Sequence, residues 1–235
     1  MTNLVKRLAR NTTGRDIIVG DVHGCFTKLR EALDAIRFDD SAGDRLIHVG
    51  DLVDRGPESA WVVEWLAQPW VHSVAGNHED MAIRWPNGNM ESGNYHANGG
   101  SWMIALDRET QREVAATLSA LPIAIELETE DGLVGVVHAE CPISPWADFT
   151  SMLEDPKLSN GKRQGLIDAC QWARTRIQMG GDSIIAGVRA VVVGHTPMRN
   201  MTSLGNTLFI DTIGWRPIGH FTLIDAATLR PARVA

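Results

Sequence analysis

Short apolar runs rich in β-branched residues recur along the chain and alternate with helical patterns. Each run has the length of a strand, and several are apolar throughout, which is typical of strands buried on both faces. The runs are residues 17–19, 46–49, 71–74, 123–125, 133–137, 190–193, 207–210 and 221–224. Helical periodicity marks residues 27–36, 59–66 and 101–121. The alternation predicts an α/β (α+β) fold, and the late strands with little helix between them predict a mixed sheet.

Composition excludes several classes of protein. With 44% hydrophobic and 22% charged residues, the 235-residue chain can bury enough apolar surface to fold, so it is not a disordered chain. A net charge of −7 gives no electrostatic reason to bind nucleic acid or an anionic membrane. Cys25, Cys141 and Cys170 are scattered and cannot form a disulfide framework. No segment resembles a signal peptide or a membrane span, so we expect a cytoplasmic protein.

Polar side chains follow five of the apolar runs, usually beside glycine. The five segments are Gly20-Asp21-Val22-His23-Gly24, Gly50-Asp51-Leu52-Val53-Asp54-Arg55-Gly56, Gly76-Asn77-His78-Glu79, His138 and Gly194-His195. The carboxyl ends of strands are where α/β sheets present ligands and catalytic groups. Asp, Asn and His supply oxygen and imidazole donors that suit divalent first-row metals. If these ends converge, the sequence predicts a dinuclear metal site there.

Each segment taken alone has a simpler interpretation. A Gly-Asp pair is usually a turn, and a histidine after a valine run is usually a core or edge residue. The segment of residues 50–56 is more demanding, because two acids and an arginine that follow a buried strand all need partners. The occurrence of all five segments together favours the functional interpretation.

Together these motifs resemble the signature of the metallophosphoesterase superfamily. The full versions at residues 50–56 and 76–79 resemble its phosphoprotein phosphatase branch, and most of all the small bacterial and phage serine/threonine protein phosphatases of the phage lambda type. Further resemblance lies in residues 98–102, 171–174 and 209–212. It covers residues 15–225, nearly the whole chain. It implies one catalytic domain over residues 1–235 with a calcineurin-like fold, a central mixed β-sandwich flanked by helices.

The resemblance also implies the roles of the metal ligands. Asp21 and His23 would bind the first metal, Asn77, His138 and His195 would bind the second, and Asp51 would bridge the two. A bridging carboxylate can hold two cations ~3.5–4 Å apart, and the pair would supply a hydroxide for in-line attack on phosphorus without a covalent phospho-enzyme.

Four further residues are implied in catalysis. Arg55 and Arg174 resemble phosphate clamps, although Arg163 and Arg176 lie near Arg174 in the sequence. A guanidinium offers two parallel hydrogen bonds to phosphoryl oxygens. His78 resembles the general acid that protonates the departing serine or threonine oxygen, and Asp54 resembles the carboxylate that orients it.

Other residues near these motifs are expected to be bystanders. His48, His72, His96 and His220 fall in strand patterns, in a loop or at a strand start, where metal ligation is not expected. Cys25 follows the first motif, but no base is paired with it. One departure from the family pattern is Glu140, two residues after His138, where a Gly or Asp is expected; it weakens any inference about peptide preference.

The expected function is a metal-dependent serine/threonine protein phosphatase, with activity toward phosphotyrosine or phosphohistidine as extensions. One alternative within the same fold is a symmetrical diadenosine tetraphosphate hydrolase, which shares the first two motifs. Another is an inactive phosphopeptide-binding scaffold. Mn²⁺ is the expected activating ion, with Fe, Zn, Co and Ni also compatible with the ligand types. The expected partner is a phosphorylated protein or peptide, and we expect a monomer without a regulatory subunit.

Overall fold

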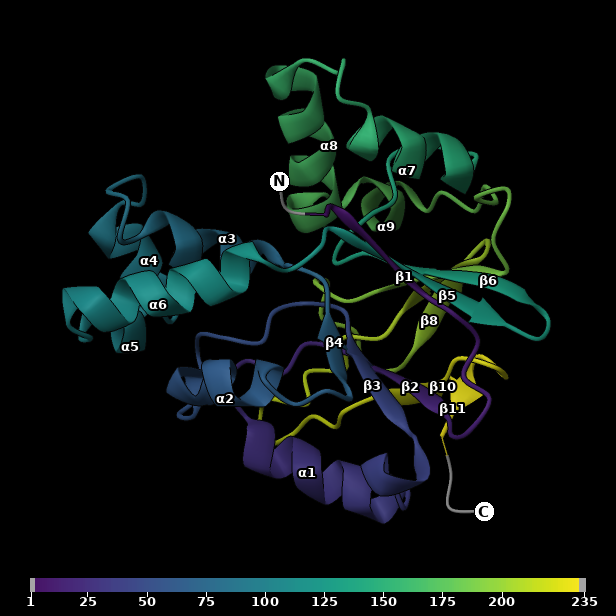
Figure 1. Cartoon of the computed structure of the whole chain (residues 1–235), viewed down its shortest axis with the longest axis horizontal. Helices are drawn as coiled ribbons and strands as arrows, with labels where there is room; N and C mark the ends of the chain where they lie inside the picture. Colours follow the sequence, from purple (N-terminus) through teal and green to yellow (C-terminus); the bar gives the residue numbers. More distant parts are fainter. Residues whose placement is uncertain (1–2, 233–235) are drawn as a thin grey trace.

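In a computed structural model that describes residues 3–232, two mixed sheets lie face to face, with helices outside them (Figure 1). The first sheet has six strands in the order β1-β5-β6-β7-β9-β8, and the second has five in the order β11-β10-β2-β3-β4. The strands are β1 Val5–Leu8, β2 Asp16–Val19, β3 Arg45–His48, β4 Val71–Ser73, β5 Ala124–Thr129, β6 Gly132–Val136, β7 Ala190–Val193, β8 Thr202–Leu204, β9 Thr207–Phe209, β10 Leu223–Asp225 and β11 Arg230–Pro231. The expected mixed β-sandwich flanked by helices is confirmed.

The helices form groups outside the sheets. In Figure 1, α7, α8 and α9 lie beyond the six-stranded sheet, α1 and α2 beyond the five-stranded sheet, and α3 to α6 together at one end. They are α1 Phe26–Ala35, α2 Val62–Leu66, α3 Asn77–Arg84, α4 Ser92–Ala97, α5 Ser101–Ile104, α6 Arg108–Ser119, α7 Trp146–Glu154, α8 Asn160–Trp172 and α9 Thr175–Met179, with 3-10 turns at Asp40–Ala42 and Ser59–Trp61. Within residues 3–232, no helix is both long enough and apolar enough to cross a membrane.

Alternate residues of the buried strands pack on opposite faces. Ile18 and Ile47 of the five-stranded sheet join Val134 and Val192 of the other sheet in the layer between the sheets. Ile17, one residue along from Ile18, packs instead with the helical residues around α1 and α2. Because side chains of a strand alternate between faces, both faces of these strands are covered, which explains their continuous apolar sequence.

Strand direction brings the functional segments to one edge. β2, β3 and β4 pair in parallel, and so do β6 and β7. Their carboxyl ends therefore lie on the same side of each sheet. The segments that follow these five strands are the ones that carry the candidate site residues.

Two segments differ from the sequence expectation. The helix expected over residues 101–121 is two helices, because Asp107 accepts hydrogen bonds from the backbone N–H groups of Glu109 and Thr110 and starts α6 anew. The glycine and asparagine residues of segment 86–100 predict an irregular surface segment, but this segment contains α4, and its Tyr95 is fully buried. Both corrections matter for the site, because this region supplies partners for Asp54.

A half-buried ion pair joins the starts of β2 and β3. The Asp44 carboxylate accepts hydrogen bonds from the backbone N–H and the guanidinium of Arg15. Burial alone would raise the pKa of Asp44, but the bonds from Arg15 outweigh it and lower that pKa below its usual value. The stabilisation is therefore present above the unfolded-state pKa of ~3.9 and is lost as the pH falls through the lower folded-state value.

Asp44→Asn is therefore expected to lower the free energy of unfolding by ~1–3 kcal/mol at pH 7. Urea denaturation of both proteins at pH 7 and near pH 3.5 measures this. The difference between them should shrink at the lower pH, because there the unfolded wild type takes up a proton at Asp44. Asp34→Asn, at an exposed position on α1, serves as the control. An equal difference at both pH values would contradict the assignment.

Candidate active site

The residues predicted from the strand ends lie together at one edge of the sandwich. Asp21 and His23 follow β2, Asp51 follows β3, Asn77 and His78 open α3 after β4, His138 follows β6, and His195 follows β7. All of these side chains are buried. The structure thus gathers groups that are up to 174 residues apart in the chain, since the backbone N–H of His195 bonds the Asp21 carboxylate.

The backbone at this edge is strained. Five of the predicted residues have left-handed φ values, which only glycine adopts at low cost; they are His23 (46°), Asp51 (52°), Asp54 (69°), Arg55 (66°) and His195 (62°). Hydrogen bonds hold the turns in place, among them those from the N–H groups of Val22 and His23 to the carbonyl of Asp51. Such strain persists where the surroundings enforce it, and it clusters at functional sites.

Glycines beside the site permit its close packing. A Cβ atom at Gly194 would overlap the Asp21 carboxylate, and one at Gly76 would overlap the Asp51 carboxylate. The glycines of the motifs thus leave room for the acids next to the backbone.

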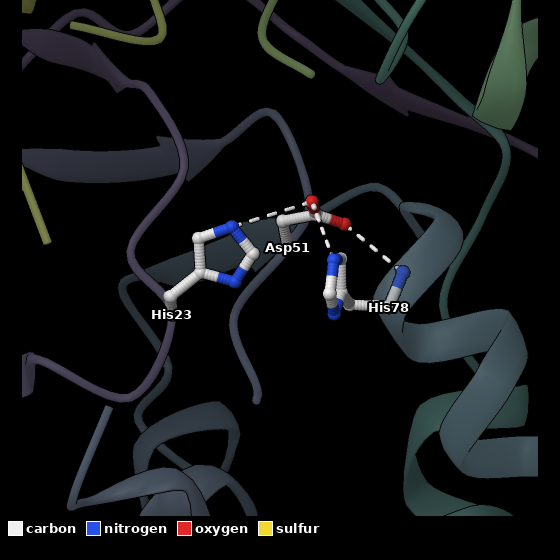
Figure 2. Close-up of side chains that lie close together, drawn as sticks. All are labelled: His23, Asp51 and His78. Atoms are coloured by element: carbon white, nitrogen blue, oxygen red, sulfur yellow. Dashed lines mark hydrogen bonds and ion pairs between the residues drawn. The ribbon is translucent and has the colours of Figure 1, made fainter. Parts of the chain in front are cut away.

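The first cluster consists of His23, Asp51 and His78 (Figure 2). The Oδ2 atom of Asp51 lies 3.6 Å from Nε2 of His23 and 3.8 Å from Nε2 of His78, and its Oδ1 accepts the backbone N–H of His78 at 3.1 Å. Nδ1 of His23 faces the carbonyl of Val53 at 2.9 Å, so Nδ1 carries the proton and Nε2 presents a lone pair to the cluster.

The second cluster consists of Asp51, His138 and His195. Nε2 of His138 lies 3.3 Å from Oδ1 of Asp51, 3.0 Å from Oδ1 of Asn77 and 3.2 Å from Nδ1 of His195. The other ring nitrogen of each histidine faces a carbonyl, 2.7 Å from Val49 for His138 and 3.2 Å from Trp172 for His195.

This geometry fixes the tautomers. The nitrogen that faces a backbone carbonyl carries the proton, so the opposite nitrogen is a lone-pair donor aimed at Asp51. Backbone carbonyls commonly orient metal-binding imidazoles in this way.

The electrostatics of the clusters favour a bound cation. Burial lowers the pKa of His23, of His138 and of His195, the last to about 3, so these rings are neutral ligands. Burial alone would raise the pKa of Asp51, but the surrounding histidines hold it below its usual value, so this carboxylate is charged. A charged carboxylate among unprotonated imidazole nitrogens is the donor set that divalent first-row metals take. The residues present therefore fit a metal pair that shares Asp51.

Asp21 lies beside these clusters, with both carboxylate oxygens 3.1 Å from the backbone nitrogen of His195. It faces Asp211, which the sequence analysis placed in a family-like segment without giving it a role. Burial raises the pKa of Asp21, and the charges of Asp211 and Asp51 raise it further; burial also raises the pKa of Asp211 to about 6. Three buried carboxylates in one place repel one another, and cations would relieve that repulsion.

His78 forms a tight pair with Asp54. Its Nδ1 lies 2.7 Å from Oδ2 of Asp54, whose Oδ1 accepts hydrogen bonds from Tyr95 Oη at 3.2 Å and Trp102 Nε1 at 2.7 Å. Nε2 of His78 has no hydrogen-bond partner among residues 3–232. Burial disfavours the charged ring, but Asp51 and Asp54 outweigh it and raise the pKa of His78. The ring can therefore hold a proton on Nε2, the nitrogen that faces Asp51.

The two aromatic partners of Asp54 were not predicted from the sequence. Trp102 lies on a helical pattern that is typical of a core residue, and Tyr95 lies in a segment whose glycines predict irregular structure. A Tyr and a Trp in or beside a glycine-rich segment could have indicated them, because a buried Tyr or Trp usually needs a hydrogen-bond acceptor.

Two arginines border the clusters. Nη1 of Arg55 lies 2.5 Å from Nε2 of His23, and Nη2 of Arg174 donates to the carbonyl of His195 at 3.3 Å. Arg176 and Arg163 are committed elsewhere: the first binds the carbonyls of a nearby loop, and the second binds those at the end of α7. Arg174 is therefore the arginine of this region that lies at the site.

The remaining histidines lie away from the clusters. His48 is buried and accepts a hydrogen bond from Trp65 at 3.0 Å, and His72 lies 3.0 Å from Lys6 Nζ. His96 lies 2.9 Å from the hydroxyl of Ser101. Glu140, the departure from the family pattern, accepts the backbone N–H of Arg176 at 3.1 Å.

Glu79 is a second omission of the sequence analysis, which quoted it in a motif and gave it no role. Its buried carboxylate accepts the backbone N–H groups of Gly76 at 2.7 Å and of Asp51 and Leu52 at 2.8 Å each. It thereby ties the turn after β3 to the start of α3. Burial, and next the charge of Asp51, raise its pKa to about 7.

Glu79→Ala is expected to lower the free energy of unfolding by ~3 kcal/mol or more, because it leaves these N–H groups buried without an acceptor. Glu79→Gln, which keeps one acceptor oxygen, should fall between the wild type and Ala. Urea denaturation of the three proteins measures the series, and equal stability of Ala and wild type would contradict the role given to Glu79.

Comparison with known proteins places this chain among phosphoesterases. A family model described as calcineurin-like phosphoesterase matches residues 15–199. Serine/threonine-protein phosphatase 1 of Salmonella typhimurium is 33% identical over 202 residues, which are 83% of this chain and 84% of the relative. Serine/threonine-protein phosphatase 2 of Escherichia coli is 33% identical over 204 residues, which are 83% of this chain and 85% of the relative. A symmetrical bis(5'-nucleosyl)-tetraphosphatase of Methylococcus capsulatus is 34% identical over 136 residues, covering 57% and 45%.

Solved structures share the fold. A putative diadenosine tetraphosphatase superimposes with a TM-score of 0.65 at 24% identity, covering 96% of this chain and 95% of the other. A cold-active protein tyrosine phosphatase superimposes with a TM-score of 0.59 at 18% identity, covering 94% and 75%. At these identities the likeness concerns the arrangement of the two sheets and their helices.

Proposed function

The chain belongs to the calcineurin-like phosphoesterase family, and from that membership and the site geometry we propose that it is a metal-dependent serine/threonine protein phosphatase. The observation that carries this proposal is the hydrogen-bonded pair of His78 and Asp54. Nε2 of His78 has no partner among residues 3–232 and faces Asp51. An alkoxide is a poor leaving group, so the hydrolysis of a serine or threonine phosphate needs a proton donor at this place.

Six residues would hold the metal pair. Asp21 and His23 would hold the first ion, Asn77, His138 and His195 would hold the second, and Asp51 would serve both. Two divalent ions bound here would supply a nucleophile at neutral pH and polarise the phosphoryl oxygens. Val53, Val49 and Trp172 hold the three imidazoles in the tautomers that the ligand roles require.

The other residues act on the substrate. Arg55 and Arg174 orient the phosphoryl group through paired N–H donors. His78 gives its proton to the departing oxygen, and Asp54 stabilises the charged ring before that transfer. Tyr95 and Trp102 donate hydrogen bonds to Oδ1 of Asp54, which keeps Oδ2 of Asp54 directed at Nδ1 of His78. The reaction is a direct in-line displacement without a covalent phospho-enzyme.

The finer assignments belong to the same proposal. Mn²⁺ is the activating ion we propose among those that the oxygen and nitrogen ligand set admits, which also include Fe, Zn, Co and Ni. Residues 1–235 act as one catalytic domain with its core in residues 15–225, and a phosphorylated protein or peptide is the substrate of a monomeric enzyme. Phosphotyrosine and phosphohistidine are further substrates to be tested.

The second candidate function is the hydrolysis of diadenosine tetraphosphate. The relative in Methylococcus capsulatus is named a symmetrical bis(5'-nucleosyl)-tetraphosphatase, and its match covers 57% of this chain and 45% of the relative. The Asp54–His78 pair speaks for the phosphatase, because a nucleotide leaves as a phosphate and needs little protonation.

One assay separates the two functions. The purified protein, titrated with Mn²⁺, is given a phosphoserine peptide and diadenosine tetraphosphate, and kcat/KM is measured for both. We expect the phosphopeptide to have the higher kcat/KM. Faster turnover of the nucleotide would replace the proposed function by the second one.

A further inference from the structure

The loop between β9 and β10 places an indole beside the site. The ring of Trp215 meets that of His23 edge-on, with centroids 4.9 Å apart. The guanidinium of Arg55 lies 4.8 Å from the centre of the indole, and the guanidinium of Arg216 lies 4.6 Å from the same centre. Two guanidinium groups therefore contact the same aromatic ring.

The backbone under Arg216 is held from several directions. Nζ of Lys28, on α1, donates to the carbonyls of Gly214, Arg216 and Gly219. The N–H of Arg216 donates to the carbonyl of Ile213 at 2.8 Å. A backbone fixed in this way loses little further entropy when the side chain binds a ligand.

Apart from its contact with Trp215, the guanidinium of Arg216 has no polar partner among residues 3–232. It is exposed, and it forms no ion pair with any carboxylate in residues 3–232 and donates no hydrogen bond there. Arg15 and Arg45 differ from it, because each is tied to a buried aspartate. The donors of Arg216 are therefore available to an anion that arrives from solvent.

We propose that Arg216 forms a second anion subsite, beside the phosphoryl subsite of Arg55, for an Asp or Glu next to the phosphorylated residue of the substrate. This inference rests on the proposed function. A guanidinium binds a carboxylate through two parallel hydrogen bonds. Both guanidinium groups contact one indole, at 4.8 and 4.6 Å from its centre, so the two subsites are close enough for the side chains of adjacent peptide residues.

The test compares phosphoserine peptides that differ only in the flanking residue, which is Glu, Gln or Lys. Wild type is expected to prefer the Glu peptide over the Gln peptide by ~3–5-fold in kcat/KM, through KM, as suits an exposed ion pair. The preference should weaken in high salt because the pair is screened. Arg216→Gln is expected to remove the preference, so that the Glu and Gln peptides have equal kcat/KM. Arg112→Gln, an exposed arginine on α6, is the matched control and should keep the preference.

Each other outcome has a distinct meaning. Hydrolysis of all three peptides without a preference, or with the same preference in Arg216→Gln, would overturn the subsite and leave the proposed function intact. Failure of every peptide, with turnover of diadenosine tetraphosphate, would overturn the proposed function and this inference with it. A larger loss for the nucleotide than for the Glu peptide in Arg216→Gln would assign the subsite to a second phosphate instead of a carboxylate.

Discussion

Asp51→Asn is expected to reduce turnover of a phosphoserine peptide by ~10³-fold or more, since a metal pair contributes several kcal/mol to the transition state. Asp51 is the one carboxylate present in both clusters, so a neutral amide weakens the binding of both cations at once. Asn keeps the size of the side chain and an oxygen that can accept the N–H of His78. The loss is therefore expected without unfolding.

Metal binding gives this variant a second readout. Elemental analysis after dialysis against Mn²⁺, and the shift of Tm with added Mn²⁺, are compared for wild type, Asp51→Asn and Asp34→Asn. Wild type and the Asp34 control should bind alike, and Asp51→Asn should bind far less. Full metal content in Asp51→Asn would contradict the shared-carboxylate assignment, whatever its activity.

His78→Asn is expected to lower kcat on a phosphoserine peptide by ~10²–10⁴-fold, the range for the loss of a general acid. The substitution removes the imidazole that Asp54 holds, and with it the proposed proton donor. The loss should be smaller on p-nitrophenyl phosphate, because that leaving group needs no proton. Steady-state kinetics on both substrates measure the difference.

Two controls make the His78 result specific. Asp54→Asn should show the same dependence on leaving group, because it removes the charge that holds the proton on His78. His96→Asn, on α4 and away from the clusters, should behave as the wild type. Equal losses of His78→Asn on both substrates would indicate that His78 acts as a metal ligand instead of an acid.

The sequence could predict the convergence at this edge because of the chemistry of strand ends. Parallel strands end on the same side of a sheet, so acids and histidines after residues 17–19, 46–49 and 71–74 had to meet. Continuous apolar runs also indicated burial on both faces, as seen for Ile17 and Ile18.

Contacts between distant segments could not be read in the same way. The bonds of Tyr95 and Trp102 to Asp54 depend on how α4 and α5 fold back over the site, and no periodicity encodes that path. The break before α6 depends on one capping aspartate within an otherwise continuous apolar stripe. The short strand β1 was missed because its sequence, Val-Lys-Arg-Leu, has two cations in its middle and becomes a strand by pairing with β5.

Anomalous diffraction at the manganese edge, from a crystal soaked in Mn²⁺, tests the central assignment most directly. Two peaks ~3.5–4 Å apart are expected, one on each side of the Asp51 carboxylate, with His23 on the first and His138 and His195 on the second. A single peak, or a pair located away from Asp51, would contradict the two-cation site on which the proposed chemistry depends.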